Sequence, residues 1–270
     1  MTSSHTFRSL HHGDALLLLP NAWDAGSARL IESVGAKAVA TTSAGLAWSR
    51  GYADGEALPV KHLLAAVREI ARVIEVPLSI DIESGYSDDP SEVAQLVTEA
   101  IDAGVAGINI EDGAGDPELL YAKIEAARQS ATSADVDLFI NARTDVYLRS
   151  LAEGHAAVAE VIRRSNQYRA AGCDGLFVPA LADPAAIAAI AAAVDPLPLN
   201  IMLVPGLPST DVLRARGVRR LSTGPAIAQA VLGSTSRLAT DFLAGAWDHM
   251  FSTAADYAAT NQIYSERERS

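Results

Sequence analysis

Three carboxylates follow two short apolar segments of the sequence. Asp81 and Glu83 end the segment 78–83, and Glu111 ends the segment 108–111. Residues two apart in a β-strand point to the same side, so Asp81 and Glu83 are expected to share one face. Like charges held close together repel each other unless a cation lies among them, and Mg²⁺ or Mn²⁺ prefers all-oxygen ligands. The pattern therefore predicts a divalent metal site made by Asp81, Glu83 and Glu111.

A second interpretation of these acids is structural. Any one of them could cap the helix that follows it or pair with a surface Lys or Arg. Three acids at the ends of neighbouring strands favour the metal site over that alternative.

Arg143 lies in a similar place, within the segment 141–145 that follows another apolar run. Its planar guanidinium offers two parallel donors to a substrate carboxylate. The alternative is an ion pair with a neighbouring acid. Both can hold, because Glu111 or Asp145 could orient Arg143 while it still faces a substrate.

Two further segments supply candidate ligand contacts. Ser43, Ala44 and Gly45 are small residues that would let backbone N–H groups approach a ligand oxygen. The polar segment 48–54 is long enough to reach over a pocket and to bring Asp54 to it as an outer-shell acid. A surface turn at Asp54 and Gly55 is the simpler alternative.

A recurring sequence pattern predicts the strands and helices that position these residues. A helix-like run, a glycine and a short apolar strand recur at Gly35, Gly104, Gly172 and Gly217, with further strand candidates between them. Glycine suits the left-handed residue that ends a helix. About eight alternating strand and helix pairs predict an α/β protein, a (β/α)8 TIM barrel, in which chemistry belongs at the carboxyl ends of the strands.

The chain is expected to form one domain over residues 1–270, with a C-terminal helical extension at 237–270. This region, which includes Trp247 and Phe251, exceeds what one barrel helix requires. It could pack under the barrel or make a subunit contact, and we expect the contact.

Composition excludes several classes of partner. The net charge of −12 disfavours nucleic acid and anionic lipid surfaces, and no segment approaches the length of a membrane helix. A cytoplasmic protein is expected. Cys173 is the single cysteine of the sequence, so no intrachain disulfide can form.

Five motifs occur together and in a fixed order. They are residues 20–24 (PNAWD), 42–46 (TSAGL), 81–86 (DIESGY), 110–113 (IEDG) and 141–145 (NARTD). With them the chain resembles the isocitrate lyase and phosphoenolpyruvate mutase superfamily over most of its length. The set is specific, although each motif alone would be weak.

The resemblance implies a Mg²⁺-dependent barrel, usually a tetramer (a dimer of dimers) with the last helix exchanged between subunits. In that comparison Asp81 corresponds to the direct metal ligand, and Glu83 and Glu111 act mostly through water. The remaining correspondences are Asp54 as the outer-shell acid on a mobile loop, Arg143 as the substrate-facing arginine, Ser43, Ala44 and Gly45 as the segment that holds the substrate carboxylate and keto oxygen, and Asn200 as a substrate-contacting asparagine.

The sequence also departs from the family. A Lys-Arg-Cys-Gly type loop with a catalytic cysteine is replaced by residues 113–118 (GAGDPE), and the Lys-Thr-Asn pattern of phosphonopyruvate chemistry is missing. The glutamate that several lyases carry after the sixth strand is absent from residues 176–180, and Glu83 stands where an aspartate is usual. Cys173 precedes a predicted strand, so it should lie at the opposite barrel face and be structural.

These observations predict an enzyme that acts on a small 2-oxo or 2-hydroxy (di)carboxylate through a metal-stabilised enolate, with a carbon–carbon lyase as first choice. One alternative is a phosphonopyruvate-type phosphonomutase or hydrolase. Others are a decarboxylase or hydrolase of an oxaloacetate-like acid, and a metabolite-binding protein with little turnover.

Overall fold

Nine parallel strands form a nearly closed barrel in the computed structural model, which describes residues 2–248 and 250–265. The hydrogen-bonded order is β1-β9-β8-β7-β6-β5-β4-β3-β2. β1 (Leu17–Leu19) pairs with β9, and β2 (Asn21–Ala22) pairs with β3. Both lie in one short segment, interrupted at Pro20, which has no N–H to give to a ladder. They act as two halves of one strand position, so the predicted (β/α)8 barrel is confirmed.

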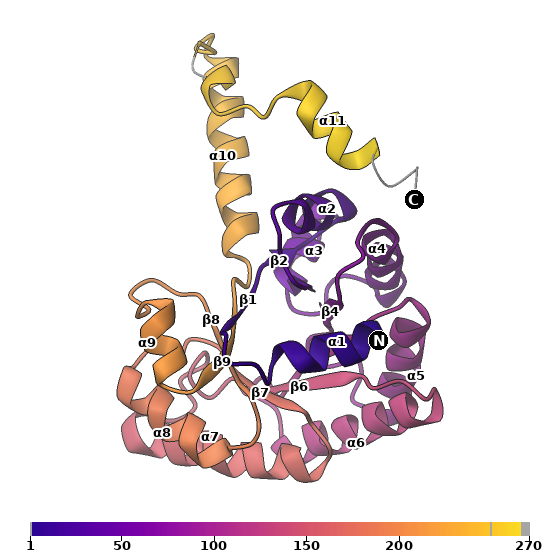
Figure 1. The fold of residues 1–270 in the computed structure, drawn as a ribbon, viewed down its shortest axis with the longest axis vertical. Helices are drawn as coiled ribbons and strands as arrows, with labels where there is room; N and C mark the ends of the chain where they lie inside the picture. The colour runs from indigo at the N-terminus through magenta and orange to yellow at the C-terminus, as the bar shows by residue number, and fades with distance from the viewer. Residues whose placement is uncertain (1, 249, 266–270) are drawn as a thin grey trace.

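The other strands and the barrel helices alternate as the sequence indicated (Figure 1). The strands are β3 (Val39–Thr41), β4 (Leu78–Asp81), β5 (Gly107–Glu111), β6 (Phe139–Arg143), β7 (Gly175–Val178), β8 (Leu199–Met202) and β9 (Val218–Ser222). The helices around them are α2 (Ala25–Ser33), α3 (Ser43–Ser49), α4 (Val60–Val73), α5 (Pro90–Asp102), α6 (Pro117–Ser133), α7 (Gly154–Ala170), α8 (Pro184–Val194) and α9 (Thr210–Ala215). Gly104 follows α5 with a φ of 87°, the left-handed stop that its sequence position predicted.

The main core lies between the strands and the surrounding helices. Ile80, Ile108 and Ile140 stand at one level of β4, β5 and β6, and all three are fully buried. Val97 of α5 and Ile124 of α6 belong to the same buried cluster. Each such side chain stabilises the fold by roughly 1.5–3 kcal/mol. This packing fixes the register of the strands whose ends carry the predicted site.

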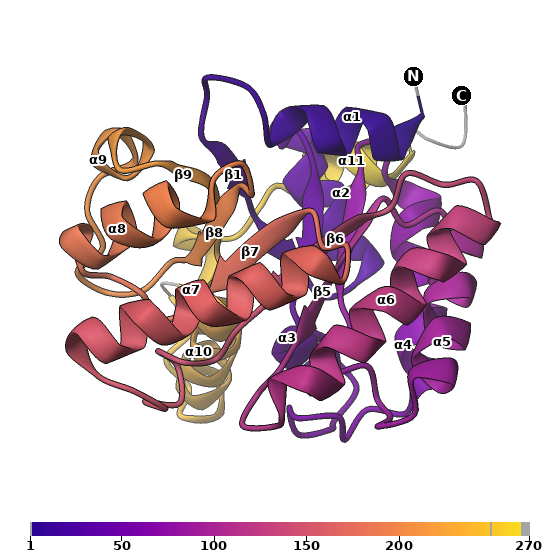
Figure 2. The same ribbon diagram turned by 90° about the horizontal axis from the view of Figure 1, so that it is seen from below.

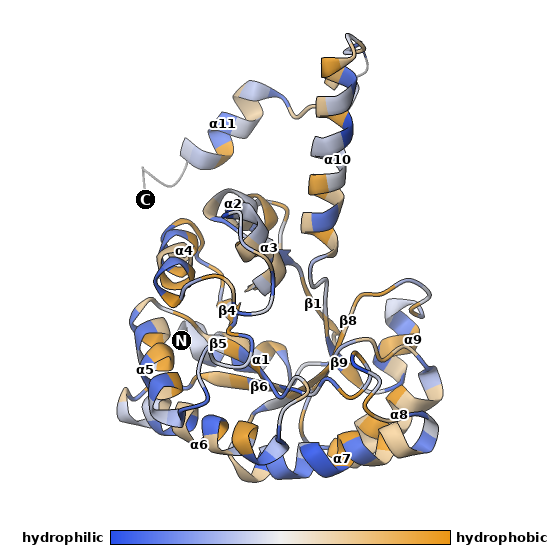
Figure 3. Ribbon diagram, turned by 180° about the vertical axis from the view of Figure 1, so that it is seen from behind, coloured by the Kyte–Doolittle hydropathy of each residue, from blue (hydrophilic) through white to orange (hydrophobic). Residues whose placement is uncertain are grey.

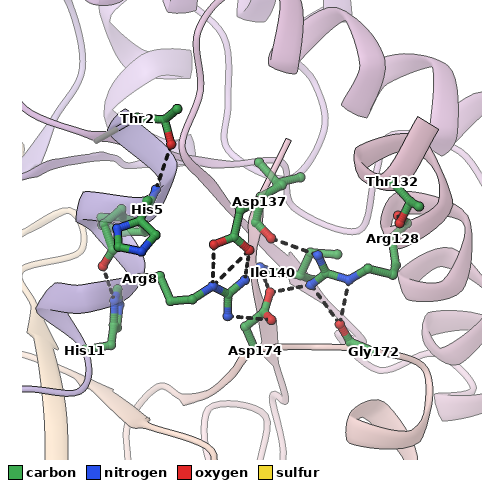
Figure 4. A network of polar contacts seen from close by, with 12 residues as sticks. Thr2, His5, Arg8, His11, Arg128, Thr132, Asp137, Ile140, Gly172 and Asp174 are labelled. Carbon is green, nitrogen blue, oxygen red and sulfur yellow. Dashed lines mark hydrogen bonds and ion pairs between the residues drawn. The ribbon is translucent and has the colours of Figure 1, made fainter. Parts of the chain in front are cut away.

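The N-terminal end of the barrel is covered by α1 (Ser3–Leu10), as Figures 1 and 2 show. Phe7 is fully buried against Phe139, with ring centroids 5.6 Å apart. Arg8 bonds Asp137 at 2.6–2.9 Å and Asp174 at 2.9 Å (Figure 4). Arg128 approaches Asp174 from the other side. Two cations therefore meet two anions at this end.

The C-terminal helices leave the barrel. α10 (Ala226–Leu243) projects away from it, and α11 (Tyr257–Ser265) turns back toward α2 after the short 3-10 helix η1 (Met250–Ser252) (Figure 1). α10 runs unbroken through position 237, so the extension begins within this helix. Figure 3 shows apolar turns along α10, and Leu243 and Phe251 are exposed by 85% and 77%. None of the helices in the described ranges has the length and hydropathy of a membrane span.

Candidate active site

The barrel brings the predicted acids and Arg143 to its carboxyl end. Asp81 lies opposite Asn109 in the register of β4 and β5, and Glu111 lies opposite Arg143 in the register of β5 and β6. β4 ends at Asp81, two residues earlier than the sequence predicted. Glu83 has a left-handed backbone with a φ of 51°, so a turn, and not strand alternation, sets its direction.

Asp81 is held by backbone and side-chain contacts from three segments. Its N–H donates to Thr41 Oγ1 at 2.9 Å, and its Oδ1 accepts from the Glu83 N–H at 3.1 Å. Burial raises the pKa of Asp81, the Arg143 charge opposes that rise, and the charge of Asp54 adds to it. The Ser43 backbone N–H, at the start of α3, also favours the ionised form. Segments 41–43, 54 and 81–83 therefore converge here.

Arg143 is oriented by two acids, as one interpretation of the sequence expected. Its Nη1 lies 2.6 Å from Glu111 Oε2, and its Nε and Nη2 donate to the two Asp145 oxygens at 2.7 and 3.2 Å. Its guanidinium also lies over Phe177 at 5.7 Å. Burial would lower the pKa of Arg143, but the neighbouring carboxylates outweigh burial and raise it. The arginine is a fixed cation at every ordinary pH.

The other titratable groups of the site are carboxyls whose pKa values are raised. Burial raises the pKa of Glu83 to about 7, the Tyr86 hydroxyl opposes that rise, and the charge of Asp81 adds to it. Burial also raises the pKa of Glu111, against the effect of Arg143. Groups that resist ionisation in this way are expected where a cation is to be bound.

The donor atoms of the site are of the kind that binds a divalent metal. The set is all oxygen, and Arg143 is committed to Glu111 and Asp145. In residues 2–248 and 250–265, no three His, Cys, Asp or Glu side chains form a ready-made metal-binding group. A metal with few direct protein ligands and several waters is the arrangement that Mg²⁺ favours. Because the donors are all oxygen, the residues present fit Mg²⁺ or Mn²⁺.

The small residues after β3 start helix α3. Ser43 is half-buried, whereas Ala44 and Gly45 are buried. A Cβ on Gly45 would lie 2.8 Å from Thr42 Cγ2 and 2.9 Å from Trp23 Cβ, so close packing requires glycine here. Their predicted contact with substrate stays a prediction.

Asn200 lies deeper than the other predicted residues. It is 1% exposed, its Oδ1 accepts from Asn141 Nδ2 at 3.1 Å, and its Nδ2 donates to the Ile201 carbonyl at 2.7 Å. Within this structure the amide is engaged inside the barrel. Its role as a substrate contact is a prediction that these contacts leave open.

A cavity of about 300 Å³ adjoins the acids, and its wall contains residues that sequence reasoning missed. Glu83 and Glu111 line it together with Glu56, Ser84 and Lys123. Lys123 is 3% exposed and donates to the Ser84 carbonyl at 2.8 Å. A lysine on the inner face of a helix was the signal available in the sequence, since buried lysines are rare without a partner.

Comparison with known proteins decides the family. Residues 7–243 match the family described as phosphoenolpyruvate phosphomutase. The chain belongs to the isocitrate lyase and phosphoenolpyruvate mutase superfamily. An uncharacterised protein of Mycobacterium tuberculosis is 39% identical over 81% of each chain, and the 2-methylisocitrate lyase of Escherichia coli is 31% identical over 72% of this chain and 69% of its own.

A solved superfamily member supports the same assignment. A Burkholderia cenocepacia protein solved as a candidate phosphonomutase is 40% identical, with a TM-score of 0.84 over 88% of this chain and 99% of its own. The chain is therefore an enzyme of a superfamily of lyases, mutases and hydrolases.

Cys173 is 6% exposed immediately before β7, at the end of the barrel opposite Asp81, and burial raises its pKa to about 12. It is a packing residue in this member.

Proposed function

We propose that this superfamily member is a Mg²⁺- or Mn²⁺-dependent lyase that breaks or forms a carbon–carbon bond in a small 2-oxo or 2-hydroxy (di)carboxylate. The observation that carries the proposal is the cluster of Asp81, Glu83 and Glu111 beside one fixed cation, Arg143. Similarity to a 2-methylisocitrate lyase supports the choice of reaction. A bound metal would supply positive charge where an enolate-type charge develops.

The protein's own residues divide the remaining work. Asp81 would hold the metal directly, and Glu83 and Glu111 would hold its waters. Arg143 would give a substrate carboxylate two parallel donors from an orientation that Asp145 already fixes. Ser43, Ala44 and Gly45 would bind the carboxylate and keto oxygen, with Asn200 behind them.

Asp54 is proposed as an outer-shell acid that acts from an exposed loop. The charge of Asp54 raises the pKa of Asp81, and this supports a position close to the proposed metal site. A carboxylate there could accept hydrogen bonds from a metal-bound water without touching the metal. Proton transfer would then use water or a loop residue, because no cysteine stands in segment 113–118.

Carbon–phosphorus chemistry is the second candidate function. It is favoured by the similarity to the candidate phosphonomutase. The missing Lys-Thr-Asn pattern argues against it.

A substrate panel separates these functions. Purified protein with Mg²⁺ would be given 2-methylisocitrate-like acids, oxaloacetate and phosphonopyruvate. The products followed would be pyruvate, glyoxylate, succinate, oxalate, phosphate and phosphoenolpyruvate. We expect pyruvate with succinate from a 2-methylisocitrate-like acid, which carries three carboxylates, or pyruvate with glyoxylate from a smaller dicarboxylate. Phosphate or phosphoenolpyruvate from phosphonopyruvate would replace the lyase by the second candidate. Tight oxalate binding without any product would show a binding protein and overturn both.

We further propose that the enzyme is a cytoplasmic homotetramer whose α10 and α11 form subunit contacts. The exposed apolar side chains Val231, Leu232, Phe242 and Leu243 of α10 support this assembly, because a solvated helix rarely carries so many. Light scattering of the intact chain should give four copies. The double variant Leu232→Asp with Phe242→Asp should contain fewer copies. If the wild-type protein and the double variant are both monomers, the proposed assembly is wrong.

A further inference from the structure

Glu56 and Glu83 lie 27 residues apart, and the carboxylate of each accepts hydrogen bonds from the other's loop across the mouth of the barrel. The Glu56 N–H donates to Glu83 Oε2 at 2.6 Å. In return Glu56 Oε1 accepts from Ser84 N at 3.1 Å, from Ser84 Oγ at 2.5 Å and from Tyr86 N at 3.1 Å. We call Glu56, Glu83, Ser84 and Tyr86 the loop clasp.

The clasp also occupies the Glu83 carboxylate. Tyr86 Oη donates to Glu83 Oε1 at 2.9 Å, so each Glu83 oxygen accepts one bond from the protein. A carboxylate oxygen has a second acceptor site, which leaves room for a water at each. Glu83 is thus held in one orientation by donors that depend on Glu56 and Tyr86.

The backbone at the clasp is strained. Six non-glycine residues among those described have a positive φ, and three of them are Glu56 at 63°, Glu83 at 51° and Tyr86 at 61°. Such conformations cost of order 1–3 kcal/mol each when they are not stabilised by their surroundings, and they concentrate at functional sites. The reciprocal hydrogen bonds are the contacts that stabilise them here.

The loop on one side of the clasp carries Asp54. Residues 51–57 are exposed, and Leu58, which is 1% exposed, is where the segment returns to the core. Between Gly51 and Leu58, the contacts of Glu56 are the hydrogen bonds that tie this exposed segment to the strand ends. On the other side Lys123 donates to the Ser84 carbonyl at 2.8 Å and fixes the turn from beneath.

We propose that Glu56 is a positioning residue: its carboxylate and N–H hold the Asp54 loop against the 83–86 turn and so orient Glu83 and Asp54 toward the metal site. Glu56 itself touches neither metal nor substrate. The inference rests on the proposed function for its consequence in catalysis, but the clasp can be measured without turnover.

The test compares Glu56→Ala, Glu56→Gln and Tyr86→Phe. Glu125 and Tyr121 supply matched controls, because Tyr121 Oη donates to Glu125 Oε1 at the same 2.9 Å on the exposed surface of α6. Glu125→Ala and Tyr121→Phe therefore remove the same groups away from the barrel mouth. Hydrogen exchange of the peptides that cover 52–58 and 82–88 would be followed in the intact protein, with Mn²⁺ affinity and kcat and KM as further readouts.

Glu56→Ala should exchange at least about 10-fold faster in both peptides and bind Mn²⁺ about 10–100-fold more weakly, the usual effect of removing a partner of a metal ligand. Glu56→Gln keeps one acceptor oxygen and should restore most of the protection. Tyr86→Phe should lower Mn²⁺ affinity with less effect on the 52–58 peptide. In Glu56→Ala, kcat should fall more than KM rises.

Exchange and Mn²⁺ affinity in Glu56→Ala equal to those in Glu125→Ala would overturn the clasp, whatever the substrate proves to be. Glu56→Gln as damaged as Glu56→Ala would also overturn it, since the acceptor oxygen would then be irrelevant. If Glu56→Ala loosens both peptides while Asp81→Ala leaves turnover intact, the clasp stands and the proposed function fails. If Glu56→Ala does not fold, Tyr86→Phe against Tyr121→Phe decides by Mn²⁺ affinity.

Discussion

The two ends of the barrel differ in the balance between their acidic and basic side chains. At the N-terminal end Arg8 and Arg128 meet Asp137 and Asp174, so charge is balanced (Figure 4). At the carboxyl end Asp54, Asp81, Glu83, Glu111 and Asp145 outnumber the cations near them. Arg143 is committed to Glu111 and Asp145, Arg149 bonds Asp145, and Lys123 donates to a carbonyl. Balanced charge stabilises a fold, whereas unbalanced buried charge costs stability and is kept where a ligand will complete it. The comparison separates the stabilising end of this barrel from its working end.

The largest effect is expected from Asp81→Ala. Because Asp81 is the proposed direct ligand, kcat/KM should fall more than about 100-fold, beyond the 10–100-fold typical of an outer-shell partner, and the dependence on Mg²⁺ should disappear. Asp102→Ala is the control, since Asp102 is an exposed acid at the end of α5 and outside the cavity. Unchanged turnover in Asp81→Ala would remove the proposed site.

The opposite end should respond in stability and not in turnover. Asp174 accepts from Arg8 at 2.9 Å and from the Ile140 N–H at 2.7 Å, so Asp174→Ala removes one of the two anions bound to Arg8, the anion bound to Arg128 and the acceptor of a backbone donor. The free energy of unfolding should fall by about 2–4 kcal/mol. Denaturant unfolding and kcat below the melting transition would be measured together. A large drop in the kcat of the folded variant would contradict the prediction that this end contributes to stability and not to turnover.

Arg143→Lys tests whether planar recognition matters at the carboxyl end. A lysine keeps the charge but loses the paired donors to Asp145, so kcat/KM should fall about 10–100-fold. Arg149→Lys is the matched control, because Arg149 donates to the same Asp145 at 3.1 Å from a half-exposed position. Equal losses in the two variants would show that Arg143 has no special contact with substrate.

The smallest effect is expected in the pH dependence of the free energy of unfolding. Burial, together with the charge of Asp81, raises the pKa of Glu83 from 4.5 to about 7. The folded metal-free protein therefore keeps a proton that the unfolded chain releases, so its stability is full below pH 4.5 and falls as pH rises to about 7. Glu83→Gln cannot lose that proton and should decline less over this window.

The difference should reach about 1–2 kcal/mol at pH 8, after allowance for solvent screening. Chemical unfolding of both proteins in chelator at pH 4.5 and pH 8 would measure it. Parallel curves for wild type and variant would mean that Glu83 ionises as freely as a surface acid and that the carboxyl end carries less strain than its contacts indicate.

Local patterns in the sequence determined the barrel and its acids. Alternating apolar runs and glycine stops are properties of neighbouring residues, and they predicted β4 to β9 and the left-handed Gly104. Because parallel strands end at one edge, Asp81, Glu111 and Arg143 could be assigned to one site before any contact was known. The family motifs then assigned the chain to its superfamily.

Tertiary structure alone decided how that site is held. Glu83 reaches the site through a left-handed turn, and Glu56, 27 residues earlier in the chain, holds that turn by hydrogen bonds. Strand periodicity predicts neither contact. The sequence also left open whether Glu111 or Asp145 orients Arg143, and the structure shows ion pairs with both. Hydrogen bonds between distant segments depend on how loops close over the strand ends, and loop closure is set by packing and not by local propensity.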